Sequence, residues 1–163
     1  MWTETKDGLY LERTMKLKSN SPSLSLAYRI KNNSDSKKEF IWANHPDLTC
    51  GPSDATESNQ IVILTQDKGL LIQDYKRSVS KSEYLPAENW ILAHDRESCE
   101  YFLQEFDRRL VNKIGVWEGI GFYTMELLFK PVVIAPGKEF IFKVKYSTGK
   151  ENLEDLLKKL GKK

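Results

Sequence analysis

Histidine is scarce in this chain, and one of its two copies stands where a predicted strand meets a loop. His45 follows the apolar segment 40–43 and directly precedes Pro46. An imidazole at a strand end can reach a bound ligand, and near neutral pH it can both donate and accept a proton. A surface histidine beside a turn is the alternative interpretation. His45 is therefore a candidate for proton transfer that needs support from a second residue.

A glutamate interrupts the apolar pattern of the segment 121–129. Alternation predicts that the core face of this strand carries Tyr123, Met125, Leu127 and Phe129. Glu126 then lies on the opposite face, with Phe122, Thr124 and Leu128. A carboxylate among apolar neighbours is costly to desolvate, and proteins tune general bases in this way. The alternative is a glutamate on the solvent-exposed face of a sheet.

A metal site is the weaker hypothesis. The pairs His45–Cys50 and His94–Cys99 share one spacing and together could supply four zinc ligands. That spacing is not a familiar zinc-ligand pair, so we expect no metal. GxGxxG, GxxxxGK[ST] and GxSxG motifs are absent from the sequence, and we expect no cofactor.

The composition narrows the class of protein. The chain has 163 residues with 25 Lys and Arg against 23 Asp and Glu, so it is too balanced to favour nucleic acid or an anionic membrane as partner. Hydrophobic residues make up 40% of it, enough for one packed core. No apolar run approaches the roughly 20 residues of a membrane span. With two cysteines and a polar N-terminal segment, the expectation is a soluble cytoplasmic protein.

Alternation with a period of two dominates the elements that must position these residues. The segments 24–30 and 140–146 each put large apolar side chains on one face, as half-buried antiparallel strands do. Further strands are expected at about 9–18, 38–43, 60–65, 69–75, 110–117 and 121–129. The segment 135–138 predicts a type II turn, and 49–60 a loop. The fold class is therefore all-β, an antiparallel β-sandwich.

Two segments depart from this period. Apolar residues at helical spacing predict that part of 87–109 is helix; these are Cys99, Phe102, Leu103, Phe106 and Leu110. The segment 151–161 predicts an amphipathic helix with acids first, lysines last and Gly161 as the stop. We expect a sandwich domain at 1–149 and a C-terminal helix and tail at 150–163.

Several segments together resemble the galactose mutarotase-like family, which includes the aldose 1-epimerases. The N-terminal ones are Glu12–Leu17, Leu24–Asn32 and Phe40–Pro46, the last ending in His-Pro. The C-terminal ones are Tyr123–Glu126, Pro131, Pro136–Glu139 and Phe140–Tyr146. The resemblance covers about 9–65 and 114–148, and it extends to the C-terminal part of the family only.

The resemblance implies a carbohydrate-binding protein that interconverts the anomers of a sugar. His45 and Glu126 match the family's general acid and general base, which open the sugar ring without metal or cofactor. Trp42, Asn44 and Trp117 are the residues we assign to substrate binding, the tryptophans by stacking on the sugar.

The chain is short for such an enzyme, because family members that work as enzymes are usually near twice its length. A shortened sandwich exposes strand edges that must be covered. We therefore expect a homodimer, with a sheet edge or an open concave face as the contact. Two other functions stay open: a non-catalytic sugar-binding module, and an assembly protein whose sheet face contacts another protein.

Overall fold

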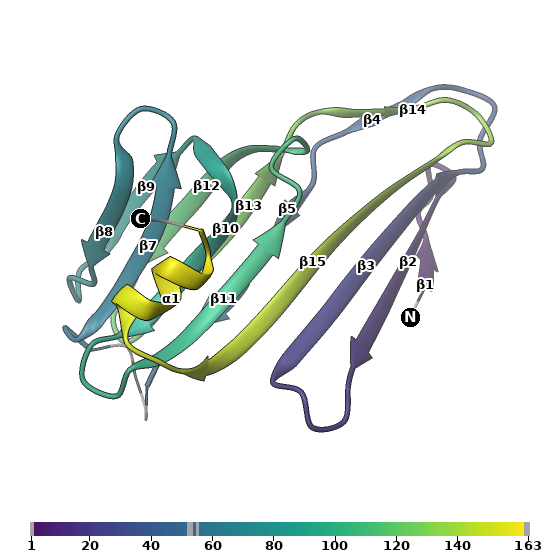
Figure 1. The fold of residues 1–163 in the computed structure, drawn as a ribbon. Helices are drawn as coiled ribbons and strands as arrows, with labels where there is room; N and C mark the ends of the chain where they lie inside the picture. Colours follow the sequence, from purple (N-terminus) through teal and green to yellow (C-terminus); the bar gives the residue numbers. More distant parts are fainter. Residues whose placement is uncertain (1, 52–53, 55, 162–163) are drawn as a thin grey trace.

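The computed structural model describes residues 2–51, 54 and 56–161, which form two antiparallel sheets, a short two-stranded ribbon and one helix (Figure 1). The large sheet has the strand order β1 (Trp2–Glu4), β2 (Leu9–Leu17), β3 (Ser23–Asn32), β15 (Glu139–Lys150), β11 (Glu100–Phe106), β10 (Pro86–Asp95), β7 (Asn59–Thr65) and β8 (Gly69–Asp74). The small sheet has the order β5 (Ala43–Asn44), β13 (Tyr123–Phe129), β12 (Val111–Glu118) and β9 (Ser80–Tyr84), and β6 (Asp47–Leu48) also pairs with β13. The ribbon joins β14 (Val132–Ile134) to β4 (Lys38–Phe40). The predicted antiparallel sandwich is confirmed.

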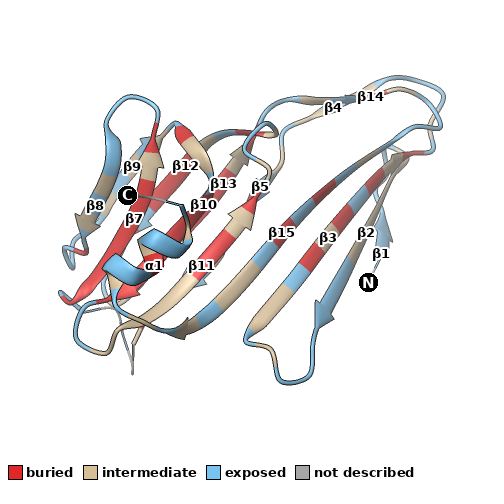
Figure 2. Ribbon diagram, viewed as in Figure 1, coloured by how far each residue is buried: buried red, intermediate tan, exposed pale blue. Residues whose placement is uncertain are grey.

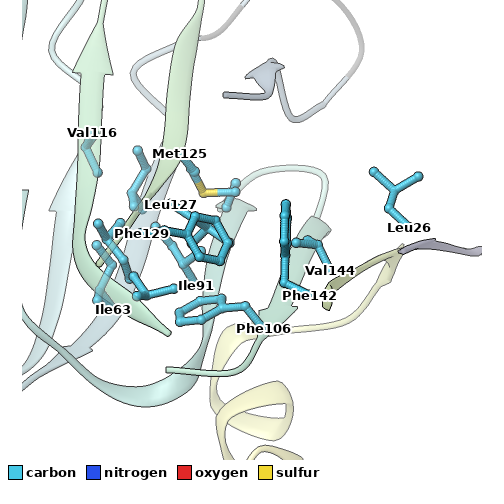
Figure 3. Packing of buried hydrophobic residues seen from close by; sticks show 14 of the residues in the cluster. Leu26, Ile63, Ile91, Phe106, Val116, Met125, Leu127, Phe129, Phe142 and Val144 are labelled. Carbon is cyan, nitrogen blue, oxygen red and sulfur yellow. The ribbon is translucent and has the colours of Figure 1, made fainter. Parts of the chain in front are cut away.

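The main core lies between the two sheets. Alternation turns one face of each strand inward, so Met125, Leu127 and Phe129 of β13 meet Phe142 and Val144 of β15 (Figure 3). The stacked rings of Tyr28 and Phe142, with centroids 4.6 Å apart, extend this core along the large sheet. Burial is concentrated in the strands that the small sheet covers (Figure 2).

A second core lies on the other face of the large sheet, under the helix α1 (Leu153–Lys159). Asn152 caps the helix, because its side-chain oxygen accepts a hydrogen bond of 2.9 Å from the backbone N–H of Asp155. Leu156 is the buried residue of the helix and packs against Val62, Leu92 and Leu103. The predicted C-terminal helix is thus present, while residues 162–163 of the predicted tail lie outside the described residues.

The prediction of helix within 87–109 is wrong, because this segment forms the strands β10 and β11. Both strands are buried on two faces, one against the main core and the other under α1. Apolar residues of both faces therefore follow one another, as in 90–93 and 101–103, and the period of two is hidden. Cys99, with φ of 58°, lies in the turn that reverses the chain between the strands.

Other details follow the sequence pattern closely. The turn at 135–138 is closed by a hydrogen bond of 3.0 Å from the N–H of Lys138 to the carbonyl of Ala135, with Gly137 at φ of 70°. Of the predicted loop 49–60, residues 52–53 and 55 lie outside the described residues, and Asn59 and Gln60 belong to β7.

No helix in the described part of the chain is long and apolar enough to cross a membrane. The two cysteines are free.

The large sheet extends well beyond the small one, so part of its inner face is uncovered (Figure 1). On β2, Met15 and Leu17 pair with Leu26 and Leu24 and share their inward side. Their exposed fractions are nevertheless 59% and 74%. An apolar row on the inner face of a sheet is what a further layer would cover.

The expected homodimer stays a prediction, and this row is where we expect the contact. We expect light scattering to give about twice the chain mass of 18.9 kDa. A double variant Met15→Lys/Leu17→Lys is expected to be monomeric, because charges in a buried contact are costly to desolvate. Val79→Lys, at a residue 84% exposed and outside this row, is the matched control. A wild-type protein that stays monomeric at all concentrations would contradict the prediction.

Candidate functional site

Glu126 lies in the middle of β13, on the face of the small sheet that points away from the main core. Its neighbours in the strand, Met125 and Leu127, point into that core. Only 6% of Glu126 is exposed. Across the strand pair stands Gly115, and a side chain there would begin 3.4 Å from Oε2 of Glu126. The glycine therefore places no side chain of its own against this buried carboxylate oxygen.

His45 reaches Glu126 from the irregular edge of the small sheet, between β5 and β6. Its Nδ1 lies 2.9 Å from Oε1 of Glu126, and its Nε2 lies 3.2 Å from Oδ1 of Asp47. The side chain of His45 is half exposed, whereas that of Glu126 is buried. The structure thus brings the two predicted acid–base residues into direct contact.

Two polar neighbours of this pair were not identified from the sequence. Thr124 donates a hydrogen bond of 3.3 Å from Oγ1 to Oε1 of Glu126, the same oxygen that His45 contacts. Asp47 faces the imidazole from β6, which pairs with β13 at Thr124. A period of two relates each to its partner, since Asp47 is two residues from His45 and Thr124 two from Glu126. This spacing is the signal in the sequence that could have identified Asp47 and Thr124.

Asn44 points the opposite way, toward the large sheet. Its Oδ1 accepts hydrogen bonds from Nε2 of Gln104 at 3.0 Å and from the hydroxyl of Tyr146 at 2.7 Å. Burial raises the pKa of Tyr146 to about 12, although the bond to Asn44 acts in the other direction. Asn44 is buried in this network, so its placement supports a role in positioning the neighbouring His45 and does not support the predicted sugar contact.

The two tryptophans assigned to substrate binding lie in different environments. Trp42 packs against the main core, with its ring 5.6 Å from those of Tyr28 and Phe142. This is the position of a core residue and does not support the predicted stacking. Trp117 is 43% exposed and pairs with Thr124, so it lies on the same face as Glu126. Nζ of Lys81 lies 4.8 Å from the ring of Trp117.

A second exposed aromatic ring borders this face. Phe122, 45% exposed, precedes β13. Its ring lies so close to Gly119 that a side chain there would begin 2.5 Å from it. Gly119 therefore makes room for this ring. Trp117 and Phe122 are the exposed aromatic groups that could contact the apolar face of a ligand.

The four residues once considered as zinc ligands do not form a metal centre. His94 is buried on β10 of the large sheet, where its Nε2 lies 3.0 Å from the carbonyl oxygen of Glu151. Cys50 is buried, and its Sγ lies 3.2 Å from the carbonyl oxygen of Glu100. Among the residues that the structure describes, no group of three or more His, Cys, Asp or Glu side chains is arranged to hold a metal ion.

The contact between His45 and Glu126 has a chemical consequence. At 2.9 Å, no atom of a ligand fits between Nδ1 and Oε1. A ligand must either part the pair or approach the exposed side of His45, where Nε2 lies beside Asp47. The imidazole can turn toward solvent, since His45 is half exposed. An imidazole and a carboxylate are both groups that can donate or accept a proton.

Comparison with known proteins supports the fold. No family model matches the sequence, and no curated protein matches it. A solved structure from Synechocystis sp. superposes with a TM-score of 0.69 at 15% identity, covering 88% of this chain and 55% of that one. A candidate aldose 1-epimerase from Klebsiella pneumoniae gives 0.73 at 13% identity, covering 90% and 48%. A galactose mutarotase-like protein from Lactobacillus casei gives 0.61 at 8% identity, covering 91% and 72%.

The chain therefore has the galactose mutarotase-like fold, and the predicted resemblance is confirmed at that level. It spans about half the length of the Synechocystis and Klebsiella proteins.

The network around Asn44 gives a testable prediction. Asn44→Ala leaves the Gln104 amide and the Tyr146 hydroxyl without their shared acceptor, so we expect the free energy of unfolding to fall by about 1–3 kcal/mol. Urea denaturation measures this change. Asn112→Ala, at an exposed position on β12, is the matched control and should have little effect. Equal losses in the two variants would show that the network does not hold β5.

Proposed function

We propose that the chain binds an aldose on the outer face of the small sheet and interconverts its anomers. The observation that carries this proposal is the 2.9 Å contact between His45 and Glu126 on a sheet of this fold. Acid–base ring opening needs one group that donates a proton and one that accepts a proton, both close to C1 of the sugar. The anomeric hydroxyl and the ring oxygen are both bonded to C1, so a pair of neighbouring side chains can serve both.

The chemistry balances without a cofactor. Glu126 accepts the proton of the anomeric hydroxyl while the protonated His45 donates one to the ring oxygen. The bond between C1 and the ring oxygen breaks, and C1 becomes an aldehyde. Rotation about the bond between C1 and C2 exposes the other face of the aldehyde. Closure returns both protons and gives the other anomer.

The neighbouring residues have supporting roles in this proposal. Thr124 holds Oε1 of Glu126, and Asp47 offers the imidazole a carboxylate when a sugar parts it from Glu126. Gly115 places no side chain against Oε2 of Glu126. Trp117 and Phe122 supply the aromatic surface on which a sugar ring can stack.

Polarimetry tests the activity directly. The protein is expected to accelerate mutarotation of freshly dissolved α-galactose or α-glucose over buffer. His45→Ala and Glu126→Gln should each reduce the rate about 10²–10⁴-fold, because each removes one proton-transfer group. Glu4→Gln neutralises an exposed carboxylate on β1 and should leave the rate unchanged. A wild-type rate equal to that of buffer would exclude catalysis on these two sugars.

A non-catalytic sugar-binding module is the second candidate. It is favoured by the closed contact of His45 with Glu126, together with the exposed rings of Trp117 and Phe122. Titration calorimetry distinguishes the two. A binding module should bind the sugar in wild type and in His45→Ala but lose binding at least about tenfold in Trp117→Ala. If Trp117→Ala binds as wild type does, the aromatic face is not the binding surface.

A further inference from the structure

A second concave surface lies on the far side of the sandwich from His45. It is a groove of about 1030 Å³, bounded by the strands β2, β3 and β15 and by the turn after β11. Thr14, Lys16, Lys143 and Lys145 line it. By alternation these side chains point to the face of the large sheet on which α1 packs, away from the small sheet.

The groove forms because β11 is shorter than its neighbour. The pairing of β11 with β15 ends where Phe106 meets Val144, while β15 continues to pair with β3 back to Glu139. The chain after Phe106 turns through Asp107 and Arg108, and this turn lines one side of the groove. The bounding strands carry the small side chains of Ser25 and Ala27. A volume near 1000 Å³ is at the upper end of ligand pockets, so it suits an oligomeric ligand.

Positive charge dominates the lining. Lys16, Lys143, Lys145, Arg108 and Arg109 contribute five cations, against the two acids Glu105 and Asp107. Two of the cations are neutralised locally. Lys145 lies 2.5 Å from a carboxylate oxygen of Glu105, and Arg109 lies 2.6 Å from one of Asp107.

The remaining cations are available to a ligand. Lys16 and Lys143 are exposed and make no ion pair with the side chains of the described residues. They stand on two strands separated by β3 and lie diagonally across it, because Lys16 pairs with Ser25 and Lys143 pairs with Ala27. Such an arrangement suits two anionic groups spaced along one ligand.

The other groups that line the groove indicate which class of negatively charged ligand it fits. Single-stranded nucleic acid is commonly held by exposed aromatic rings, but the rings that line the groove, Phe106 and Phe142, are buried at 6% and 2% exposure. A peptide that binds by strand addition needs a free strand edge, but β2, β3 and β15 are each paired on both sides. Thr14, Ser25 and Asn89 instead offer side-chain groups that can hydrogen-bond to sugar hydroxyls.

We propose that this groove binds an anionic oligosaccharide, with Lys16, Lys143 and Arg108 holding its carboxylates. The site is separate from the His45–Glu126 pair and does not depend on the proposed catalytic function. The chain then carries two sugar-binding faces, one on each side of the sandwich.

Titration calorimetry with a galacturonate hexamer tests the proposal. Wild type should bind it, and added salt should weaken the binding because exposed charges are screened. The double variant Lys16→Gln/Lys143→Gln should bind at least about tenfold more weakly, because it removes two charge-assisted contacts. Lys37→Gln/Lys130→Gln makes the same change of net charge at exposed lysines that do not line the groove, and is the matched control. His45→Ala should bind as wild type does.

Three results would overturn the proposal. The first is no binding of the hexamer by wild type. The second is equal weakening in the two double variants, since net charge alone would then explain it. The third is binding of an oligothymidylate or a polyglutamate as tight as that of the hexamer, which would identify a general polyanion surface. Circular dichroism on each variant ensures that a loss of binding is not a loss of fold.

Discussion

The amide side chain of Asn44 joins the two sheets at the point where the candidate site begins. It stands on a strand of only two residues, which could not hold its place by ladder hydrogen bonds alone. Bonds to Gln104 and Tyr146 fix it to two strands of the large sheet. The next residue is His45, so the position of the imidazole depends on a polar contact in an otherwise apolar interface. Buried polar groups are costly unless they are paired, and this pairing therefore specifies one arrangement of the chain.

Glu126, the other half of the site, is positioned by apolar packing of its strand. Glu126 stands on the central strand of the small sheet, between apolar residues that pack into the main core. Its backbone is rigid, and its carboxylate oxygen is held further by Thr124. The site therefore combines a buried carboxylate with a half-exposed imidazole at a sheet edge. A buried carboxylate beside a more exposed imidazole suits a site in which one group must move when a ligand enters.

The sequence predicted the parts of this molecule whose two faces differ. Strands such as β3 and β15 alternate apolar and polar residues because one face is buried and the other is exposed to solvent. The same contrast identified Glu126 as an exception on β13. The prediction failed for β10 and β11 because these strands are covered on both faces and lack this contrast. Asn44 was assigned to the ligand because type and spacing cannot tell on which side of a two-residue strand a side chain lies, and Trp42 directly precedes that strand. The spacing of two residues from His45 could have pointed to Asp47, and its contact with the imidazole follows from the pairing of β6 with β13 directly after Pro46.

The order of strands in the large sheet bears on how the protein is made. β15, the last strand of the chain, lies in the interior of the sheet between β3 and β11. It alone connects the N-terminal strands β1 to β3 with the rest of that sheet. During synthesis on a ribosome, the sheet thus exists as two separate pieces until about residue 150 has emerged. Their open edges at β3 and β11 must stay apart from other chains for that time, and contacts between residues so distant in sequence form slowly.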